Sequence, residues 1–270
     1  MISNKSSFIN RIVKLIAWCV IFVLFTNLMI DVNAMAKTIT PFLITSVANN
    51  AVVPKEGKDC IIIIGDSRSC GLLVHIDANP MYKRKYYYHE GIIYDGIVEG
   101  DDVIIAVFAE SGGNYYMGSM KKSIDRFMKA FKSYSEIHNA KSYKVFNLYG
   151  YNDIAVAVKT NIPWPKKYVK ADEAFKKQLG DKCTMFYQFN AGPVNEDGFH
   201  CIVDGFQNST IEEYNKDFIP TKDINVFDLF GYLQNKGLGP IEDAPENSGI
   251  HYSLKTNQDI FDVILHLAKE

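Results

Sequence analysis

The feature that most constrains the fold is a run of five apolar residues at 60–64, of which four are isoleucine. A continuous, β-branched run of this length is typical of a strand that is buried on both faces of a parallel sheet. Similar runs recur along the chain, at residues 103–109, 143–149, 183–189 and 224–227. The sequence therefore predicts a sheet of several buried strands.

Amphipathic stretches separate these runs. The longest, 117–138, carries apolar residues at a spacing of three to four, and shorter ones lie at 171–179 and 211–218. A last helix is expected over 256–270, with a capping-box-like start at Thr256 and Asp259. Strands that alternate with helices favour right-handed crossovers and a parallel α/β sheet.

One segment departs from this alternation. Residues 82–94 are aromatic and basic, with consecutive tyrosines at 86–88 after Lys83, Arg84 and Lys85. We predict a surface hairpin or an edge strand here. A rim that contacts a sugar or another substrate is the alternative.

The first 36 residues have the composition of a signal peptide. Basic residues precede an uncharged run at 15–30, and small residues follow around Ala34 and Ala36. The run is short for a membrane span, which needs about 20 residues. Counting back to residue 9 lengthens it, so an uncleaved membrane tether through 9–30 stays open.

In either case the rest of the chain is expected to be secreted or to lie on the extracytoplasmic face of the membrane. Residues 37–58 are interpreted as a linker because prolines and a glycine interrupt them, and 59–270 as the folded domain.

Charge and cysteine usage exclude some functions. The formal net charge of -2 provides no positive field, so no nucleic-acid partner is expected. The domain holds four cysteines, an even number that allows disulfides in an oxidising compartment; buried free thiols are the alternative. They are Cys60, Cys70, Cys183 and Cys201. Metal-ligand spacing is absent from the sequence, and we expect neither a metal nor a cofactor.

Polar, glycine-bearing segments follow the predicted strands. They are Gly-Asp-Ser-Arg-Ser at 65–69, Glu-Ser-Gly-Gly-Asn at 110–114 and Gly-Tyr-Asn-Asp at 150–153. A fourth, Ser-Gly-Ile-His-Tyr at 248–252, precedes the last helix. Because sites in doubly wound sheets form at the carboxyl ends of strands, these four segments are expected to converge on one edge.

Taken in order, the four segments resemble the SGNH (GDSL-type) hydrolase family over about residues 60 to 270. The four marker residues of that family match Ser67, Gly112, Asn152 and His251. The resemblance implies a three-layer α/β/α sandwich with a parallel, flavodoxin-like sheet. It also implies ester or acyl chemistry on lipids, glycans or small esters.

The residue types suit that chemistry. A serine hydroxyl is a weak nucleophile until a base takes its proton, so Ser67 is the candidate nucleophile and His251 the base. The backbone N–H groups of Ser67 and Gly112 and the side-chain amide of Asn152 are candidate oxyanion donors, with Gly113 as the register alternative to Gly112. Structural roles stay open beside these. Ser67 could cap a helix, the glycines could form a plain turn, Asn152 could be an N-cap or Asx-turn residue, and His251 could be a structural loop histidine.

The chain departs from the family pattern three residues before the histidine, where Ser248 stands in place of an aspartate. Ser248 or a backbone carbonyl could orient His251 in a dyad. Alternatively, Glu246 or Asp243 supplies the acid, or the site is weakened and serves binding.

The neighbouring charged residues are interpreted structurally. Asp66 and Asp153 are expected to brace loops by accepting hydrogen bonds from amides. Arg68 is interpreted as a surface arginine. The alternative is that it pairs with Asp66, with Asp153 or with a substrate carboxylate.

The sequence thus predicts an extracytoplasmic serine esterase that hydrolyses an O-acyl ester, acetyl foremost, of a glycan, a lipid or a small molecule. An O-acyltransferase that uses the same acyl-enzyme is one alternative. A non-catalytic glycan-binding module with the same fold is the other.

Overall fold

The computed structural model describes residues 57–160, 168–198, 201, 207–239 and 250–270. The predicted signal peptide or tether at 1–36, the linker up to residue 56, and Ser248, Glu246 and Asp243 lie outside them. None of the helices in these ranges is long and apolar enough to cross a membrane.

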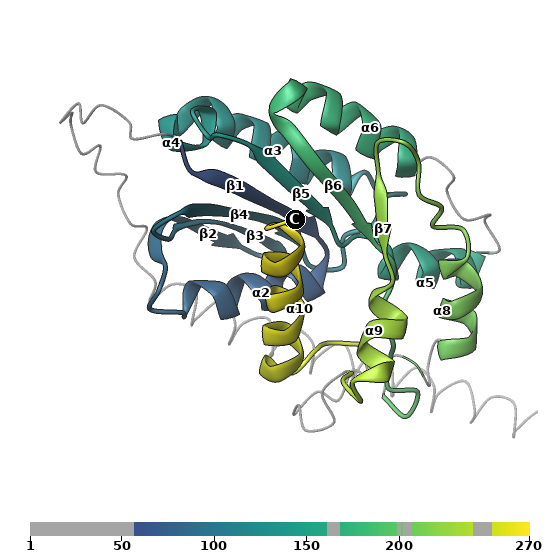
Figure 1. Ribbon diagram of the computed structural model, residues 1–270. Helices are drawn as coiled ribbons and strands as arrows, with labels where there is room; N and C mark the ends of the chain where they lie inside the picture. Colours follow the sequence, from purple (N-terminus) through teal and green to yellow (C-terminus); the bar gives the residue numbers. More distant parts are fainter. Residues whose placement is uncertain (1–56, 161–167, 199–200, 202–206, 240–249) are drawn as a thin grey trace, which may run out of the picture. The chain divides into compact units, whose positions relative to one another are not determined.

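The centre of the domain is a seven-stranded sheet in the order β2-β3-β4-β1-β5-β6-β7 (Figure 1). Its strands are β1 (Asp59–Gly65), β2 (Lys83–Glu90), β3 (Ile93–Glu99), β4 (Val103–Glu110), β5 (Tyr143–Asn147), β6 (Cys183–Phe189) and β7 (Asn225–Phe227). The pairs from β4 through β1, β5 and β6 to β7 are all parallel, and β2 and β3 add an antiparallel hairpin at one edge. Numbered along the chain, the five parallel strands have the order 2-1-3-4-5, which is the flavodoxin-like arrangement.

Helices cover both faces of the sheet. They are α2 (Ser67–Asp77), α3 (Ser119–Ser133), α4 (Ser135–His138), α5 (Tyr151–Thr160), α6 (Tyr168–Leu179), α8 (Asn208–Asn215), α9 (Leu229–Asn235) and α10 (Leu254–Leu267). Ile62 and Ile64 of β1 pack in one core with α3 and α6, while Ile61 and Ile63 pack in a second core with α2 and α10. Figure 1 shows these two helix layers on opposite sides of the sheet. The predicted three-layer α/β/α fold is confirmed.

The predicted segment 82–94 is the β2–β3 hairpin, and β2 is an edge strand. Its exposed residues include Lys83, Arg84 and Lys85, and the pairing with β3 shifts register between Arg84 and Tyr86. Charged side chains and a bulge are devices that protect a sheet edge from pairing with other chains. The turn of the hairpin contacts the loop after β4, because the Ser111 N–H donates to the Ile92 carbonyl at 2.7 Å.

Three boundaries differ from those predicted. The expected helix at 117–138 is broken into α3 and α4 by Tyr134, which has extended backbone angles. The expected strand at 143–149 ends at Asn147, whose side chain accepts a hydrogen bond from the Tyr149 N–H.

The last helix also starts earlier than predicted. It begins at Leu254, and its N-cap is Ser253, whose hydroxyl accepts from the Thr256 N–H at 3.1 Å. The predicted capping role of Thr256 and Asp259 is therefore wrong.

The cysteines of the sheet are too far apart to pair with each other. Cys60 and Cys183 both pair with Tyr143, from its two sides, so two strand spacings, about 9.5 Å, separate them. A disulfide needs Cα atoms within about 7 Å. In the structure Cys60, Cys70 and Cys183 are buried free thiols, and Cys201 is also buried.

A buried carboxylate joins β5 to α6. Asp172 is 1% exposed and accepts a hydrogen bond from the Asn147 side-chain amide at 2.7 Å. Burial raises the pKa of Asp172 to about 8, although the bond from Asn147 lowers it.

This carboxylate should make stability depend on pH. The folded state keeps the Asp172 proton between its usual pKa of 3.8 and about 8. The free energy of unfolding should therefore fall as pH rises through that window, by up to about 1.4 kcal/mol per pH unit. We expect Asp172→Asn to remove the part of this dependence that Asp172 contributes. The free energy of unfolding should therefore fall less between pH 5 and pH 9 in the variant than in the wild type. Urea denaturation at both pH values measures this, with exposed Asp125→Asn as the control; the same pH dependence for wild type and Asp172→Asn would contradict it.

Candidate active site

The turn between β1 and α2 presents Ser67 at the carboxyl edge of the sheet. Gly65 is required there, because a Cβ would lie 1.9 Å from the Ser69 hydroxyl oxygen. The N-cap of α2 is Asp66, whose side chain accepts from the Arg68 N–H at 3.0 Å. The interpretation of Ser67 as the cap is therefore wrong: Ser67 is the first residue of α2, and it is half-buried.

The N-terminus of α2, where Ser67 lies, is an environment that favours negative charge. The first amides of a helix lack intrahelical acceptors, and the N-terminal end of the helix dipole favours negative charge. Asp66 is fully buried, and burial raises its pKa to about 6, while the nearby Arg68 charge and N–H lower it. The predicted bracing role of Asp66 is confirmed by its bond to the Arg68 amide.

The loop after β4 is a tight turn built on two glycines. Gly112 has a φ of 69°, the left-handed region that favours glycine, and its Cβ position is open. Gly113 is buried and donates its N–H to the Glu110 carbonyl at 2.8 Å. A Cβ on Gly113 would lie 2.6 Å from that carbonyl oxygen, so only glycine fits.

Asn152 joins this loop to the one after β5. Its side-chain amide donates to the Gly113 carbonyl at 3.0 Å. The amide nitrogen carries two N–H groups, so this bond orients the group and leaves it a second N–H. The structure thus brings Asn152 and the Gly112–Gly113 turn together.

Asp153 strengthens the same connection. It is fully buried, and one carboxylate oxygen accepts from the backbone N–H of Tyr115 at 2.7 Å and of Tyr116 at 3.3 Å, while the Tyr168 hydroxyl donates to the other. Burial raises the pKa of Asp153 to about 6, and these hydrogen bonds lower it. The prediction that Asp153 braces a loop is confirmed.

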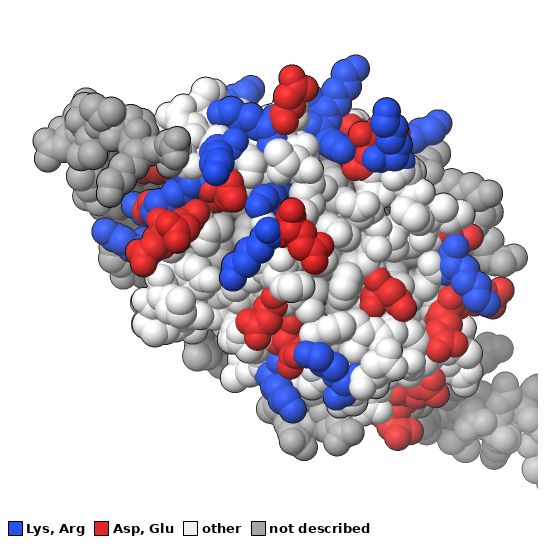
Figure 2. Space-filling model, viewed as in Figure 1, with Lys and Arg blue, Asp and Glu red and all other residues white. Residues whose placement is uncertain are grey.

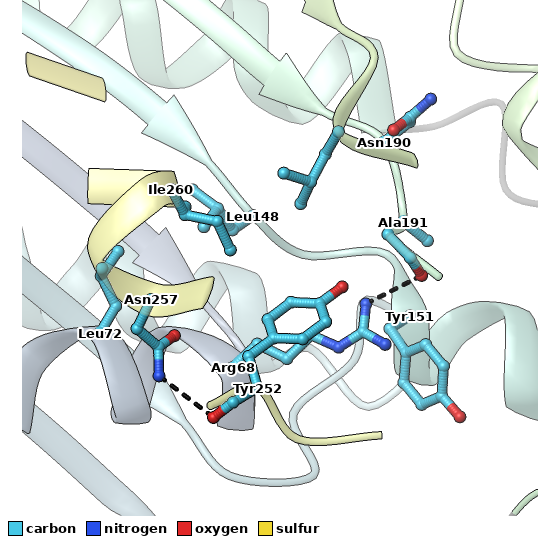
Figure 3. Close-up of a pocket in the computed structure, with 11 residues that line it drawn as sticks. Arg68, Leu72, Leu148, Tyr151, Asn190, Ala191, Tyr252, Asn257 and Ile260 are labelled. Carbon is cyan, nitrogen blue, oxygen red and sulfur yellow. Dashed lines mark hydrogen bonds between the residues drawn. The ribbon is translucent and has the colours of Figure 1, made fainter. Parts of the chain in front are cut away.

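Arg68 is not the surface residue that was predicted. It is 7% exposed, and its Nε donates to the Ile250 carbonyl at 2.9 Å. Its guanidinium carbon lies 4.2 Å from the ring centroid of Tyr151 and 4.4 Å from that of Tyr252 (Figure 3). Since Ile250 and Tyr252 flank His251, these contacts hold the histidine loop against the N-terminus of α2. His251 itself is exposed.

A small pocket lies beside the Arg68 guanidinium (Figure 3). Leu72, Leu148, Leu229 and Ile260 supply much of its apolar wall, and Asn190 and Asn257 are among its polar residues. Its volume of about 10 Å³ leaves room for at most about one water molecule, so it is too small to hold a substrate. Its lining includes Tyr151 and Tyr252 but none of Ser67, Gly112, Asn152 and His251.

Asn190 is a structural residue of this region that sequence reasoning missed. Its amide donates to Asp228 at 2.8 Å, and its oxygen accepts from the Phe230 N–H at 3.1 Å. It thereby ties the loop after β6 to the start of α9. A single asparagine after a strand carries too little signal to reveal this role.

The wider surface shows mixed charge. On the described part of the face in Figure 2, Lys and Arg side chains are interspersed with Asp and Glu. Within the described ranges, no group of three His, Cys, Asp or Glu side chains is placed to hold a metal ion.

Comparison with known proteins yields distant structural similarity. No family model matches the chain, and no curated protein does. One similar solved structure is LAE5, an alpha/beta hydrolase enzyme from the metagenome of Lake Arreo, Spain, at 13% identity and a TM-score of 0.42, covering 78% of this chain and 95% of that one.

Two further structures are mutants of Axe2 from Geobacillus stearothermophilus. One is described as an acetyl-xylooligosaccharide esterase, at 13% identity, and one as a catalytic mutant of an acetylxylan esterase, at 14%. Both have a TM-score of 0.36 and cover 79% of this chain and 95% of theirs. Similarities at these scores do not bear on the activity of this chain.

The two glycines should respond differently to an added methyl group. The methyl group of Gly112→Ala would meet no atom. The variant should therefore lose only the about 1 to 2 kcal/mol of stability that a left-handed backbone costs a non-glycine residue. Gly113→Ala meets the Glu110 carbonyl and displaces the acceptor of Asn152, so we expect a larger loss of about 3 kcal/mol. Urea denaturation of both variants tests this, and equal losses would contradict the tight turn described for Gly113.

Proposed function

We propose that the chain is an extracytoplasmic serine esterase that acts through an acyl-enzyme. The observation that carries the proposal is the capping of α2 by Asp66, which leaves the Ser67 hydroxyl at the first helical position without a capping role. Two contacts support it. Asn152 bonds to the Gly113 carbonyl, and Arg68 holds the residues on both sides of His251.

The proposed reaction has two halves. The Ser67 oxygen forms a bond to the acyl carbon while its proton passes to His251, and the N–H groups of Ser67, Gly112 and Asn152 bind the oxyanion. The ester bond breaks, and the alcohol leaves with the proton from His251. Water then attacks the acyl carbon while its proton passes to His251. The bond between the acyl carbon and the Ser67 oxygen breaks, and His251 returns the proton to that oxygen, which releases the acid and restores the Ser67 hydroxyl.

The proposed substrate is an O-acyl ester, acetyl foremost, of a glycan, a lipid or a small molecule. The export segment predicted at 1–36 motivates a surface or secreted substrate. The group that orients His251 is proposed to be Ser248 or a backbone carbonyl, in a dyad. Alternatively it is the carboxylate of Glu246 or Asp243, which precede His251 in the chain. An acyltransferase would form the same acyl-enzyme and pass the acyl group to a sugar hydroxyl, so the product formed in the presence of an acceptor sugar separates the two activities.

The nucleophile is tested directly. We expect Ser67→Ala to lower kcat for p-nitrophenyl acetate by about 10⁴-fold or more and to abolish labelling by a fluorophosphonate probe. The matched control is Ser135→Ala, an exposed serine that is also the first residue of a helix. Unchanged turnover in Ser67→Ala, or no labelling of the folded wild type, would leave a glycan-binding module in place of an esterase.

The base is tested in the same assay. We expect His251→Gln to lower kcat/KM by about 10² to 10⁴-fold, because proton transfer from Ser67 then lacks its acceptor. His266→Gln is the control, since His266 is exposed and its ion-pair partner is Glu270, at the end of the chain. A comparable loss in both variants would remove His251 from the mechanism.

A further inference from the structure

Arg68 connects the segments that carry the proposed site residues. It directly follows Ser67, its guanidinium lies over the ring of Tyr151, which precedes Asn152, and it contacts Ile250 and Tyr252, which enclose His251. Arg68 is thus the sequence neighbour of Ser67 and contacts the sequence neighbours of Asn152 and His251. The fourth, Gly112, is reached through the bond from Asn152 to Gly113.

The contacts use the full geometry of a guanidinium. In its plane, Nε and the two Nη atoms donate to the carbonyls of Ile250 at 2.9 Å, Gly192 at 3.2 Å and Pro193 at 3.3 Å. The rings of Tyr151 and Tyr252 lie near the guanidinium carbon (Figure 3). A lysine ammonium has neither the planar fork nor the stacking surface, so it cannot reproduce this set.

The acceptors are backbone carbonyls and not carboxylates. Each of these bonds therefore fixes the position of the main chain in a loop. One bond is to residue 250 in the histidine loop, and the other two are to residues 192–193 in the loop after β6. A charged donor makes such bonds about twice as strong as neutral ones. The buried Asp66 carboxylate lies close enough for the charge of Arg68 to lower its pKa, so the cation has a counter-charge in the same turn.

We propose that Arg68 is a positioning residue: it holds the main chain on both sides of His251 against the turn that carries Ser67. This inference rests on the proposed esterase function. Arg68 touches no reacting atom in this role and acts through the histidine loop. Misplacement of a catalytic group by about 1 Å can cost about 100-fold in rate.

The test compares Arg68→Lys with Arg84→Lys. Arg84 also lies over a tyrosine ring, that of Tyr87 at 4.9 Å, and it pairs with Asp77, at the opposite end of α2 from Ser67. We expect Arg68→Lys to lower kcat for p-nitrophenyl acetate by about 10 to 100-fold with KM changed by less than about three-fold. Amide hydrogen exchange over residues 250–256 should rise in Arg68→Lys and stay at the wild-type rate in Arg84→Lys.

The outcomes separate the two proposals. If Ser67→Ala abolishes turnover but Arg68→Lys keeps kcat and the exchange rate of 250–256, the positioning role is overturned and the esterase stands. If Ser67→Ala leaves turnover unchanged, the esterase fails and the positioning role fails with it. A kcat loss in Arg84→Lys equal to that in Arg68→Lys would show a general stability effect and also overturn the role. Urea denaturation of both variants measures that effect.

Discussion

The structure depends on β1, which pairs with parallel neighbours on both sides and buries both of its faces. Ile62 lies opposite Ala106 of β4 and Val145 of β5, and alternate isoleucines enter the two cores. Full burial of such a side chain contributes roughly 1.5 to 3 kcal/mol. Because β1 is the middle strand of the seven-stranded sheet and pairs in parallel with β4 and β5, its carboxyl end must open between the loops that follow those two strands. The placement of Ser67 is a consequence of this constraint.

The edge itself is held by buried polar groups. Asp66 and Asp153 are fully buried. Asp66 accepts from the Arg68 amide at the start of α2, and Asp153 accepts from amides of the loop after β4. Burial of these carboxylates has a cost, which appears as their raised pKa values. A loop fixed in this way keeps its N–H groups in one direction, and fixed dipoles are what an oxyanion site requires. The same hydrogen bonds therefore stabilise this edge of the sheet and fix the direction of its N–H groups.

Local patterns were sufficient for the parallel strands, the edge hairpin and the order of the four loops. Isoleucine-rich runs and polar segments at their ends are properties of short windows, and so is the basic, aromatic composition of 82–94. The burial of Arg68 was not predictable, because its partners Gly192 and Ile250 are 124 and 182 residues away in the chain. The cap of α2 was misassigned for a related reason: Asp66 and Ser67 are both good capping residues, and only the backbone turn decides between them.

The contacts of Arg68 also change what is required of the group that orients His251. A catalytic histidine must have its Cα in the right place and its ring in the right rotation. In the proposed site the first requirement is met by Arg68, through the Ile250 carbonyl and the ring of Tyr252. The remaining group need only fix the ring and its tautomer, for which a single acceptor is sufficient. A serine at position 248, where the SGNH pattern that the sequence resembles has an aspartate, is then compatible with a working base, because its hydroxyl oxygen is such an acceptor. A carboxylate there would stabilise the imidazolium further, so the substitution bears on the rate of proton transfer and not on where the histidine lies.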